Sequence, residues 1–268
     1  MNRTFGTLLI LAGAMAALPA AAQVKSSAAS RATEPYDLSL SAGADYSSGS
    51  YGASRDTKIF IAPVSLSLKS DAWRLSASVP YLRIDGPGGV VLGPDGRPLP
   101  GVPLTGGVRS GLGDLSLAAT VSLPPDSLGG FNIDLTGRVK LPTSKRSEHL
   151  GTGKTDYSAS ADISYPIGNW APFVTLGYRI PGDPAGINLK NTFTSSVGTS
   201  LAVGHTVYIV SYDYSQASSP LAKDAQEIFG AVSAPATDRL NVTAYGIAGL
   251  SDGSPDYELG LLLTVKLR

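Results

Sequence analysis

Cysteine is entirely absent from the chain, and this absence excludes several kinds of chemistry at once. A chain without cysteine forms no disulfide bonds, offers no thiolate ligands to a metal and has no thiol nucleophile. Histidine is scarce as well, because only His149 and His205 occur among 268 residues. Little material remains for a metal site or a catalytic triad, so we expect no metal, no cofactor and no catalytic residue.

Net charge and long hydrophobic runs are the other absences. The 21 basic residues balance the 21 acidic residues, so the formal net charge is zero. Since nucleic-acid-binding proteins usually carry a basic face, we expect no nucleic-acid partner. No segment after the N-terminal region contains the roughly 18 consecutive apolar residues of a membrane-spanning helix. We therefore expect no membrane-crossing helix.

The N-terminal residues have the pattern of an export signal. Arg3 precedes the apolar run LLILAGAMAALPA, and three alanines, 20–22, supply small residues for cleavage before Gln23. This order is typical of a secretory signal peptide, which we predict over residues 1–22; a buried N-terminal helix is the weaker interpretation. Residues 23–35 are small and polar, and we expect a flexible periplasmic lead-in there.

The rest of the chain, residues 36–268, alternates between apolar and polar residues. In FNIDLTGRVKL, Phe131 and Ile133 fall on one face and Asn132 and Asp134 on the other. A period of two indicates a β-strand with one apolar and one polar face. Such segments run to about ten to thirteen residues, whereas ordinary strands have about five or six and tilted membrane-spanning strands about nine to eleven. The predicted strands lie near 36–46, 57–68, 73–84, 109–123, 131–141, 155–167, 170–181, 192–203, 205–215, 225–235, 238–250 and 256–267.

The connections between these strands alternate in length. Short ones occur near 70–72, 124–130, 168–169, 204 and 237, and longer ones at 47–55, 86–108, 142–154, 182–190 and 216–224. This asymmetry is typical of outer-membrane barrels, which have short periplasmic turns and long extracellular loops. We predict an all-β fold, a single twelve-stranded antiparallel transmembrane β-barrel over residues 36–268. A β-sandwich also alternates, but its strands are shorter and its connections lack this asymmetry.

One hairpin allows the register to be predicted. With Gly168-Asn169 as a two-residue turn, Ile167 faces Trp170, and the pairs that follow are Tyr165 with Pro172, Ile163 with Val174, Ala161 with Leu176 and Ala159 with Tyr178. All these residues lie on the apolar faces of their strands. A slip of one residue would oppose apolar to polar faces throughout.

Aromatic residues on the apolar faces gather at the strand ends. One group, next to the short turns, contains Trp73, Phe131, Tyr165 and Trp170. The other, next to the long loops, contains Tyr46, Tyr81, Tyr157, Tyr178, Phe193 and Tyr214. Two such groups predict the aromatic girdles of a barrel at the two membrane interfaces, so the apolar faces point to lipid.

The polar faces then point into the lumen and carry charges of both signs. The lumen-lining candidates are Arg74, Asp114, Asp134, Arg138, Lys140, Asp156, Asp162, Arg179, Asp213, Glu227, Glu258 and Lys266. We expect Arg179 opposite Ser158 and diagonal to Asp156, and Asp114 across from the Arg138/Lys140 end of the next strand. These charges either form a polar path or fill a closed barrel; the small side chains around them, such as Ser116, Ala118 and Ser160, favour a path.

Two long loops raise functional questions. The stretch EHLGTGKT (148–155) ends like a phosphate-binding P-loop but lacks its first glycine, and an alternating segment, not a helix, follows it. Its residues His149, Gly151, Gly153 and Lys154 are instead candidates for a gate at the barrel mouth. The loop 86–108 is rich in glycine, proline and apolar residues, and either folds into the mouth or lies on the surface.

Several phrases resemble a known family. They are Gly111 to Asp114, Lys140 to Thr143, Leu150 to Gly153 with Asp156, and Gly177 to Arg179 with Gly182. These phrases are similar to the outer-membrane family catalogued under a meta-pathway of phenol degradation, whose members are often labelled transporters. The resemblance implies an outer-membrane β-barrel that admits hydrophobic or aromatic compounds, and it implies no catalytic residue.

The function predicted from the sequence is passive uptake of small hydrophobic or aromatic compounds across the outer membrane of a Gram-negative bacterium. Expected partners are outer-membrane lipid, a small-molecule solute and the barrel-assembly machinery. One alternative is a lipid-modifying hydrolase that uses His149 with Ser144 or Ser147, since such an enzyme needs a serine activated by a histidine. The other is a closed structural or adhesive barrel.

Overall fold

The computed structural model describes residues 36–51, 53, 55–87, 90–100, 106–184 and 186–268. The predicted signal peptide and lead-in therefore lie outside the described residues. Nearly all regular structure is β-strand, and two 3-10 helices, η2 (Pro125–Ser127) and η3 (Arg146–Glu148), lie in connections. Within the described ranges, no helix is long and apolar enough to cross a membrane.

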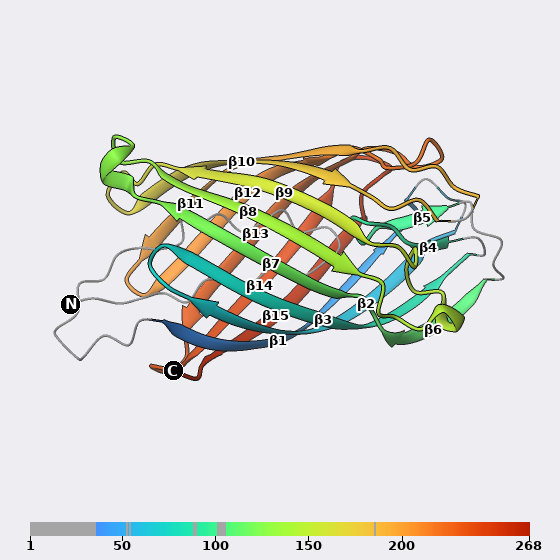
Figure 1. Cartoon of the computed structure of the whole chain (residues 1–268), viewed down its shortest axis with the longest axis horizontal. Helices are drawn as coiled ribbons and strands as arrows, with labels where there is room; N and C mark the ends of the chain where they lie inside the picture. Colours follow the sequence, from blue (N-terminus) through green and yellow to red (C-terminus); the bar gives the residue numbers. More distant parts are fainter. Residues whose placement is uncertain (1–35, 52, 54, 88–89, 101–105, 185) are drawn as a thin grey trace.

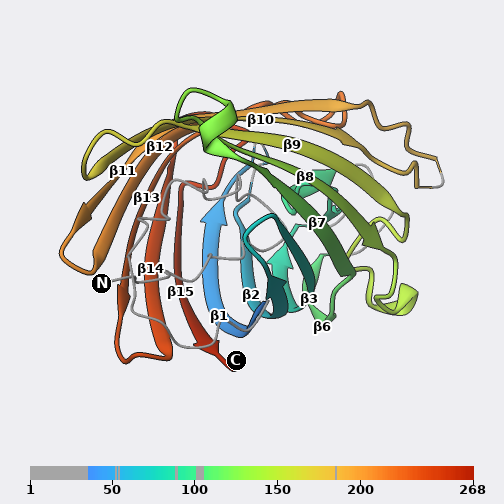
Figure 2. The same ribbon diagram turned by 60° about the vertical axis from the view of Figure 1, so that its left-hand side comes forward.

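The strands form one large antiparallel sheet that closes on itself. β1 pairs with β15 on one side and β2 on the other, and β2 continues to β3, which closes the ring (Figures 1 and 2). Strands β6 and β7 run one after the other along β3, so the thirteen strands of this sheet make a twelve-stranded barrel. The predicted fold is confirmed. The strands are β1 (Asp37–Gly49), β2 (Thr57–Lys69), β3 (Trp73–Gly86), β4 (Val90–Leu92), β5 (Pro98–Pro100), β6 (Gly107–Leu112), β7 (Leu115–Leu123), β8 (Asn132–Leu141), β9 (Asp156–Ser164), β10 (Trp170–Ile180), β11 (Thr192–Val203), β12 (Thr206–Ser215), β13 (Ala225–Pro235), β14 (Leu240–Gly249) and β15 (Tyr257–Lys266).

The strand predicted over 109–123 is interrupted between β6 and β7. Pro80 on β3 has no N–H, so it cannot donate a hydrogen bond to the neighbouring strand. Its carbonyl accepts the N–H of Gly113 at 2.8 Å. Residues 113–115 face only residues 79 and 80, so one extra residue forms a bulge, which shifts the alternation by one position. Val108 and Leu112 point outward before the bulge, whereas Leu117 points outward after it. The bulge places Asp114 at the inner wall, where it is buried.

The predicted hairpin register is confirmed. Ile163 pairs with Val174, Ala161 with Leu176, and the bridge between Ile167 and Trp170 closes the turn. Gly168 in this turn has a φ of 61°, a left-handed conformation that glycine adopts without strain. The apolar faces of β9 and β10 therefore point the same way, towards the outside.

The outer surface is apolar along the strands and aromatic at their ends. Leucine, valine and isoleucine side chains on alternate positions are exposed around the barrel. All the predicted girdle residues lie on this surface, and the rings of Phe131 and Tyr165 pack together with centroids 4.8 Å apart. Tyr214 is only partly exposed, because its hydroxyl donates to Asp224 at 2.8 Å. Both girdles are as expected for a membrane-embedded barrel.

The loop between β3 and β6 folds into one mouth of the barrel. Its strands β4 and β5 form a small separate hairpin, here called the mouth hairpin (residues 90–100). Figure 1 shows it at the end of the barrel away from the C-terminus. Of the two interpretations of this loop, folding into the mouth is correct, since Val91, Leu92 and Leu99 are buried. Two further apolar residues of this loop, Val102 and Leu104, lie outside the described residues.

Candidate functional site

An arginine fastens the mouth hairpin to the inner wall. The Arg97 Nη2 atom donates to Oε1 of Glu227 on β13 at 2.9 Å, and Nη1 lies 3.7 Å from Oδ2 of Asp95. The Arg97 side chain is 11% exposed and that of Glu227 0%. Burial alone would lower the pKa of Arg97, but the carboxylates of Glu227 and Asp95 outweigh it and raise the pKa above its ordinary value. Arg97 therefore stays charged.

Apolar contacts hold the rest of the mouth hairpin. Val91 and Leu99 pack against Leu189 from the loop between β10 and β11. Leu92 packs with Leu150 and with inward side chains of β2 and β3. The N–H of Leu92 also donates to the carbonyl of Leu150 at 3.3 Å. Three loops thus meet inside the mouth, and Leu92 and Leu150 cover its β2–β3 side.

Acidic residues surround the point where Arg97 attaches. Asp213 on β12 lies opposite Glu227 in register, and both side chains point inward and are buried. Glu258 on β15 and Asp45 on β1 continue this band, and Asp45 accepts a hydrogen bond from the Tyr245 hydroxyl at 2.9 Å. The band contains three residues that the sequence placed in the lumen, Asp213, Glu227 and Glu258, together with Asp45, which was not predicted to lie there.

The family motifs converge on one lysine at the rim. Lys140 Nζ lies 2.8 Å from Oδ2 of Asp114 and 2.9 Å from Oδ2 of Asp156. The other oxygen of Asp114 accepts the N–H of Ser144 at 3.0 Å, which ties the loop after β8 to the bulge. Asp114 therefore lies at the Lys140 end of β8, as predicted. The motif residues Asp114, Lys140 and Asp156 act as a structural joint between β7, β8 and β9.

The expected position of Asp156, diagonal to Arg179, is confirmed, but the ion pair of Asp156 within 4.0 Å is with Lys140. Arg179 lies opposite Ser158, as predicted, but Asp156 lies directly opposite Lys140 and forms its ion pair there. Asp156 pairs with Lys140 because cross-strand side chains in register are closer than diagonal ones. Oδ1 of Asp156 is also occupied, since it accepts the N–H of Gly182 at 2.9 Å.

The remaining lumen candidates lie at other levels of the inner face. Arg74 pairs with Asp134 at 3.6 Å, and Asp162 accepts the Thr175 hydroxyl at 2.7 Å. Lys266 pairs with Asp37 at 2.6 Å, with both side chains about two-fifths exposed (43% and 42%), so this pair lies at the periplasmic rim. Arg138 and Arg179 form no ion pair within 4.0 Å in the part of the chain that the structure describes.

The four gate candidates are not brought together at one point. Gly151 bridges to Leu92 of the mouth hairpin, whereas His149 and Lys154 are exposed. Gly153 has a φ of 66° and makes a turn. The Nδ1 atom of His149 contacts the backbone carbonyl of Ser147 at 3.1 Å, and among the described residues no hydrogen bond joins its ring to a serine hydroxyl. The arrangement needed by the hydrolase alternative is therefore not formed here.

No group of three or more histidine, cysteine, aspartate or glutamate residues within the described segments is arranged to hold a metal ion.

An apolar patch lies on the inner wall below the acidic band. Its eight members point inward from β10, β12, β13 and β14, and we call them the lumen patch. They are Ala171, Phe173, Val207, Ile209, Phe229, Ala231, Tyr245 and Ile247. The sequence analysis missed this patch, because inward positions were expected to be polar.

Glycines on neighbouring strands let the aromatic members of the lumen patch lie against the wall. A Cβ at Gly198 would come within 2.5 Å of the Phe173 ring, and a Cβ at Gly260 would collide with the Tyr245 ring. The signal in the sequence was an inward aromatic residue in register with a glycine on the adjacent strand: Phe173 with Gly198 and Tyr245 with Gly260. On the opposite inner wall, β1 to β3 and β7 carry buried serines such as Ser41, Ser65 and Ser78, and β2 and β3 also carry the inward Ile59, Ile61, Leu82 and Ile84.

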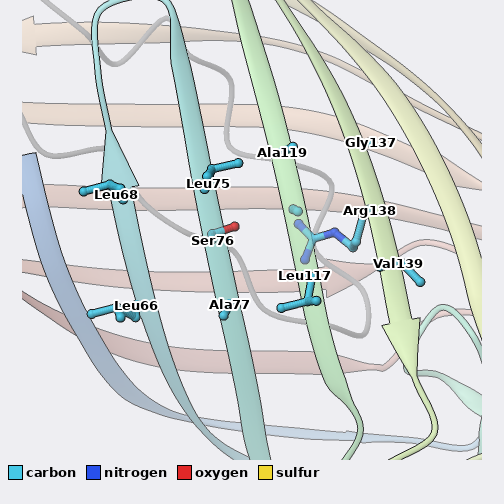
Figure 3. A pocket seen from close by; sticks show the side chains of 11 residues that line it. Leu66, Leu68, Leu75, Ser76, Ala77, Leu117, Ala119, Gly137, Arg138 and Val139 are labelled. Carbon is cyan, nitrogen blue, oxygen red and sulfur yellow. The ribbon is translucent and has the colours of Figure 1, made fainter. Parts of the chain in front are cut away.

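The outer surface also has a hollow. It has a volume of about 610 Å³ and lies between β2, β3, β7 and β8. Figure 3 shows the leucines Leu66, Leu75 and Leu117 around it, with the small residues Ala77 and Gly137 among them. Most residues that line the hollow point outward, towards lipid, but Ser76, Ala118 and Arg138 from inward positions line it as well.

Solved structures share the fold at low sequence identity. The NanC porin is 11% identical, with 85% of this chain and 99% of that chain covered and a TM-score of 0.52. The β domain of the Bordetella autotransporter BrkA is 11% identical, with 87% and 99% covered and a TM-score of 0.51. The Ralstonia pickettii toluene transporter TbuX is 11% identical, with 88% and 90% covered and a TM-score of 0.44. Identities this low concern the fold alone, which is that of outer-membrane barrels.

Sequence comparison identifies the family. No curated protein matches the chain. The family model described as "Putative MetA-pathway of phenol degradation" matches residues 52–267, which is most of the chain and includes all the motifs noted above. The resemblance predicted from those motifs is confirmed, and the chain belongs to this family.

Proposed function

We propose that the protein is a passive channel for small hydrophobic or aromatic compounds in the outer membrane of a Gram-negative bacterium. It is surrounded by outer-membrane lipid and is inserted by the barrel-assembly machinery. The observation that carries the proposal is the lumen patch, since eight inward apolar side chains stand out against the polar interior that is usual for outer-membrane barrels. The family description, which names phenol degradation, supports the same class of solute.

The arrangement of the lumen supports a route with two parts. The mouth hairpin narrows the entrance, and a solute that enters there passes the charged groups around Arg97. Below it, Phe173 and Phe229 offer apolar contacts to an aromatic ring, and buried serines line part of the opposite wall. Ligand sites that combine an apolar wall with a few polar groups are common for small molecules.

The experiment is single-channel recording with the folded barrel in planar bilayers. We expect a measurable ion conductance that benzyl alcohol reduces at lower concentration than glucose does. The double variant F173A/F229A should require a higher concentration of benzyl alcohol for the same reduction, since apolar burial is lost. The matched control is Phe193→Ala, which removes an aromatic ring from the outer surface. Absence of conductance, or equal effects of benzyl alcohol and glucose, would refute the proposal.

A further inference from the structure

Two arginines on the inner wall stand on either side of a serine. Arg138 on β8 and Arg179 on β10 both lie opposite Ser158 on β9 in register. Neighbouring strands are about 4.8 Å apart, so the two arginine Cα atoms are separated by about 10 Å. Two long side chains at this spacing can reach one small anion between them.

These two arginines differ from other cations of the lumen. Lys140, Arg74 and Arg97 each lie within 4.0 Å of a carboxylate. Arg138 and Arg179 do not in the described segments. The charges that act on Arg138 are those of Arg179 and Arg74, both positive, whereas Arg179 is influenced by Arg97 and by the carboxylates of Asp95 and Asp156. The Nη1 atom of Arg179 is buried with no hydrogen-bond partner. A buried donor without a partner is costly, and an anion relieves that cost.

The surroundings leave room for an anion. In Figure 3 the Arg138 side chain extends from β8 towards β7, where the inward residues are small. At the next inward position of each strand, two residues away, Thr136, Ser160 and Gly177 lie opposite one another. Asp156, the nearest inward carboxylate on β9, already faces Lys140. Asp95 of the mouth hairpin and Asp156 offset part of the charge of Arg179, but neither forms an ion pair with it within 4.0 Å.

We propose that Arg138 and Arg179, with Ser158 between them, bind the carboxylate group of aromatic acids that enter the lumen. This inference rests on the proposed function, because it assumes that small aromatic solutes pass. A guanidinium matches a carboxylate through two parallel N–H bonds, and charge-assisted bonds of this kind are the strong ones. Phe173 lies six residues from Arg179 along β10, about 20 Å away. A small aromatic acid therefore contacts the arginines and the lumen patch in succession.

The test compares benzoate with benzyl alcohol in planar bilayers containing the folded barrel. The quantity measured is the concentration of each compound that halves the single-channel current. In the native protein benzoate should act at a lower concentration than benzyl alcohol. R138Q or R179Q should raise the benzoate value about tenfold and leave the benzyl alcohol value unchanged, because each removes one charge-assisted contact. The matched control is R55Q, which alters an exposed loop ion pair with Asp85.

The outcomes separate this inference from the proposed function. Two outcomes would refute the anion site and leave the channel proposal intact. In the first, benzyl alcohol reduces the current of the native protein and benzoate acts at no lower concentration. In the second, benzoate acts at the same concentration on R138Q and R179Q as on the native protein. Inorganic phosphate acting as strongly as benzoate would overturn the assignment to carboxylates. If neither aromatic compound changes the current of the native protein, the proposed function itself fails. Heat-modifiable gel mobility of each variant shows whether its barrel has folded.

Discussion

Removing Arg97 should release the mouth hairpin. In R97Q the buried Glu227 loses its ion-pair partner at 2.9 Å. Breaking one side of a buried ion pair costs about 3–5 kcal/mol, and an exposed pair about 0–1 kcal/mol. Because water in a lumen relieves part of the penalty, we take about 2 kcal/mol, which shifts the equilibrium between inserted and displaced hairpin about 30-fold.

The apolar contacts of the hairpin limit this effect. Val91 and Leu99 remain buried in R97Q, and burying each such side chain contributes about 1.5–3 kcal/mol. The hairpin should therefore stay inserted most of the time but open more often. Single-channel recordings of R97Q should show more frequent or larger open states than those of the native protein.

Cysteine labelling measures the same equilibrium directly. The chain has no native cysteine, so L99C carries the single thiol. Its rate of reaction with a maleimide follows the population of the displaced hairpin, and R97Q should raise that rate about 30-fold. The charge-swapped pair R97E/E227R should restore slow labelling, and R55Q in the exposed loop should leave it unchanged. Equal labelling rates with and without R97Q would refute the claim that Arg97 holds the mouth hairpin to the inner wall.

Three further changes test other parts of the fold. Lys140→Met leaves Asp114 without its partner, and the free energy of unfolding in guanidinium should fall by about 3 kcal/mol; an unchanged value would contradict the structural joint. Gly260→Ala places a methyl group against the Tyr245 ring and should destabilise the barrel by about 1–3 kcal/mol, and the second change Tyr245→Ala should restore stability. Leu176→Arg puts a charge on the lipid-facing surface near mid-strand and should cost about 2–4 kcal/mol, also measured by unfolding.

The sequence predicts the strands well because one physical pattern determines them. A barrel wall has lipid on one side and a polar interior on the other, so every strand alternates, and β11 (Thr192–Val203) and β13 (Ala225–Pro235) have the bounds predicted for them. The interruption between β6 and β7 was missed, although its signal was present. Outward apolar residues change from even to odd positions between Leu112 and Leu117.

The interior was harder to predict, since its contacts join distant parts of the chain. Arg97 and Glu227 are 130 residues apart, and nothing local to Arg97 indicates which acidic residue it meets. The Lys140 joint was partly predictable, because the predicted register placed Asp114 across from the end of its strand. The lumen patch was not predictable in this way. Alternation places Phe173 and Phe229 on the inner face, but it does not show that inward apolar side chains from several strands lie together there.

Uptake by whole cells tests the central claim most directly. The native protein and F173A/F229A are expressed in a Gram-negative host that lacks its general porins, and initial uptake of labelled phenol and labelled glucose is measured. The account predicts that the native protein raises phenol uptake above the empty-vector level but leaves glucose uptake low, and that F173A/F229A loses most of the gain. Phenol uptake equal to that of the empty vector, with the barrel folded in the outer membrane, would contradict it.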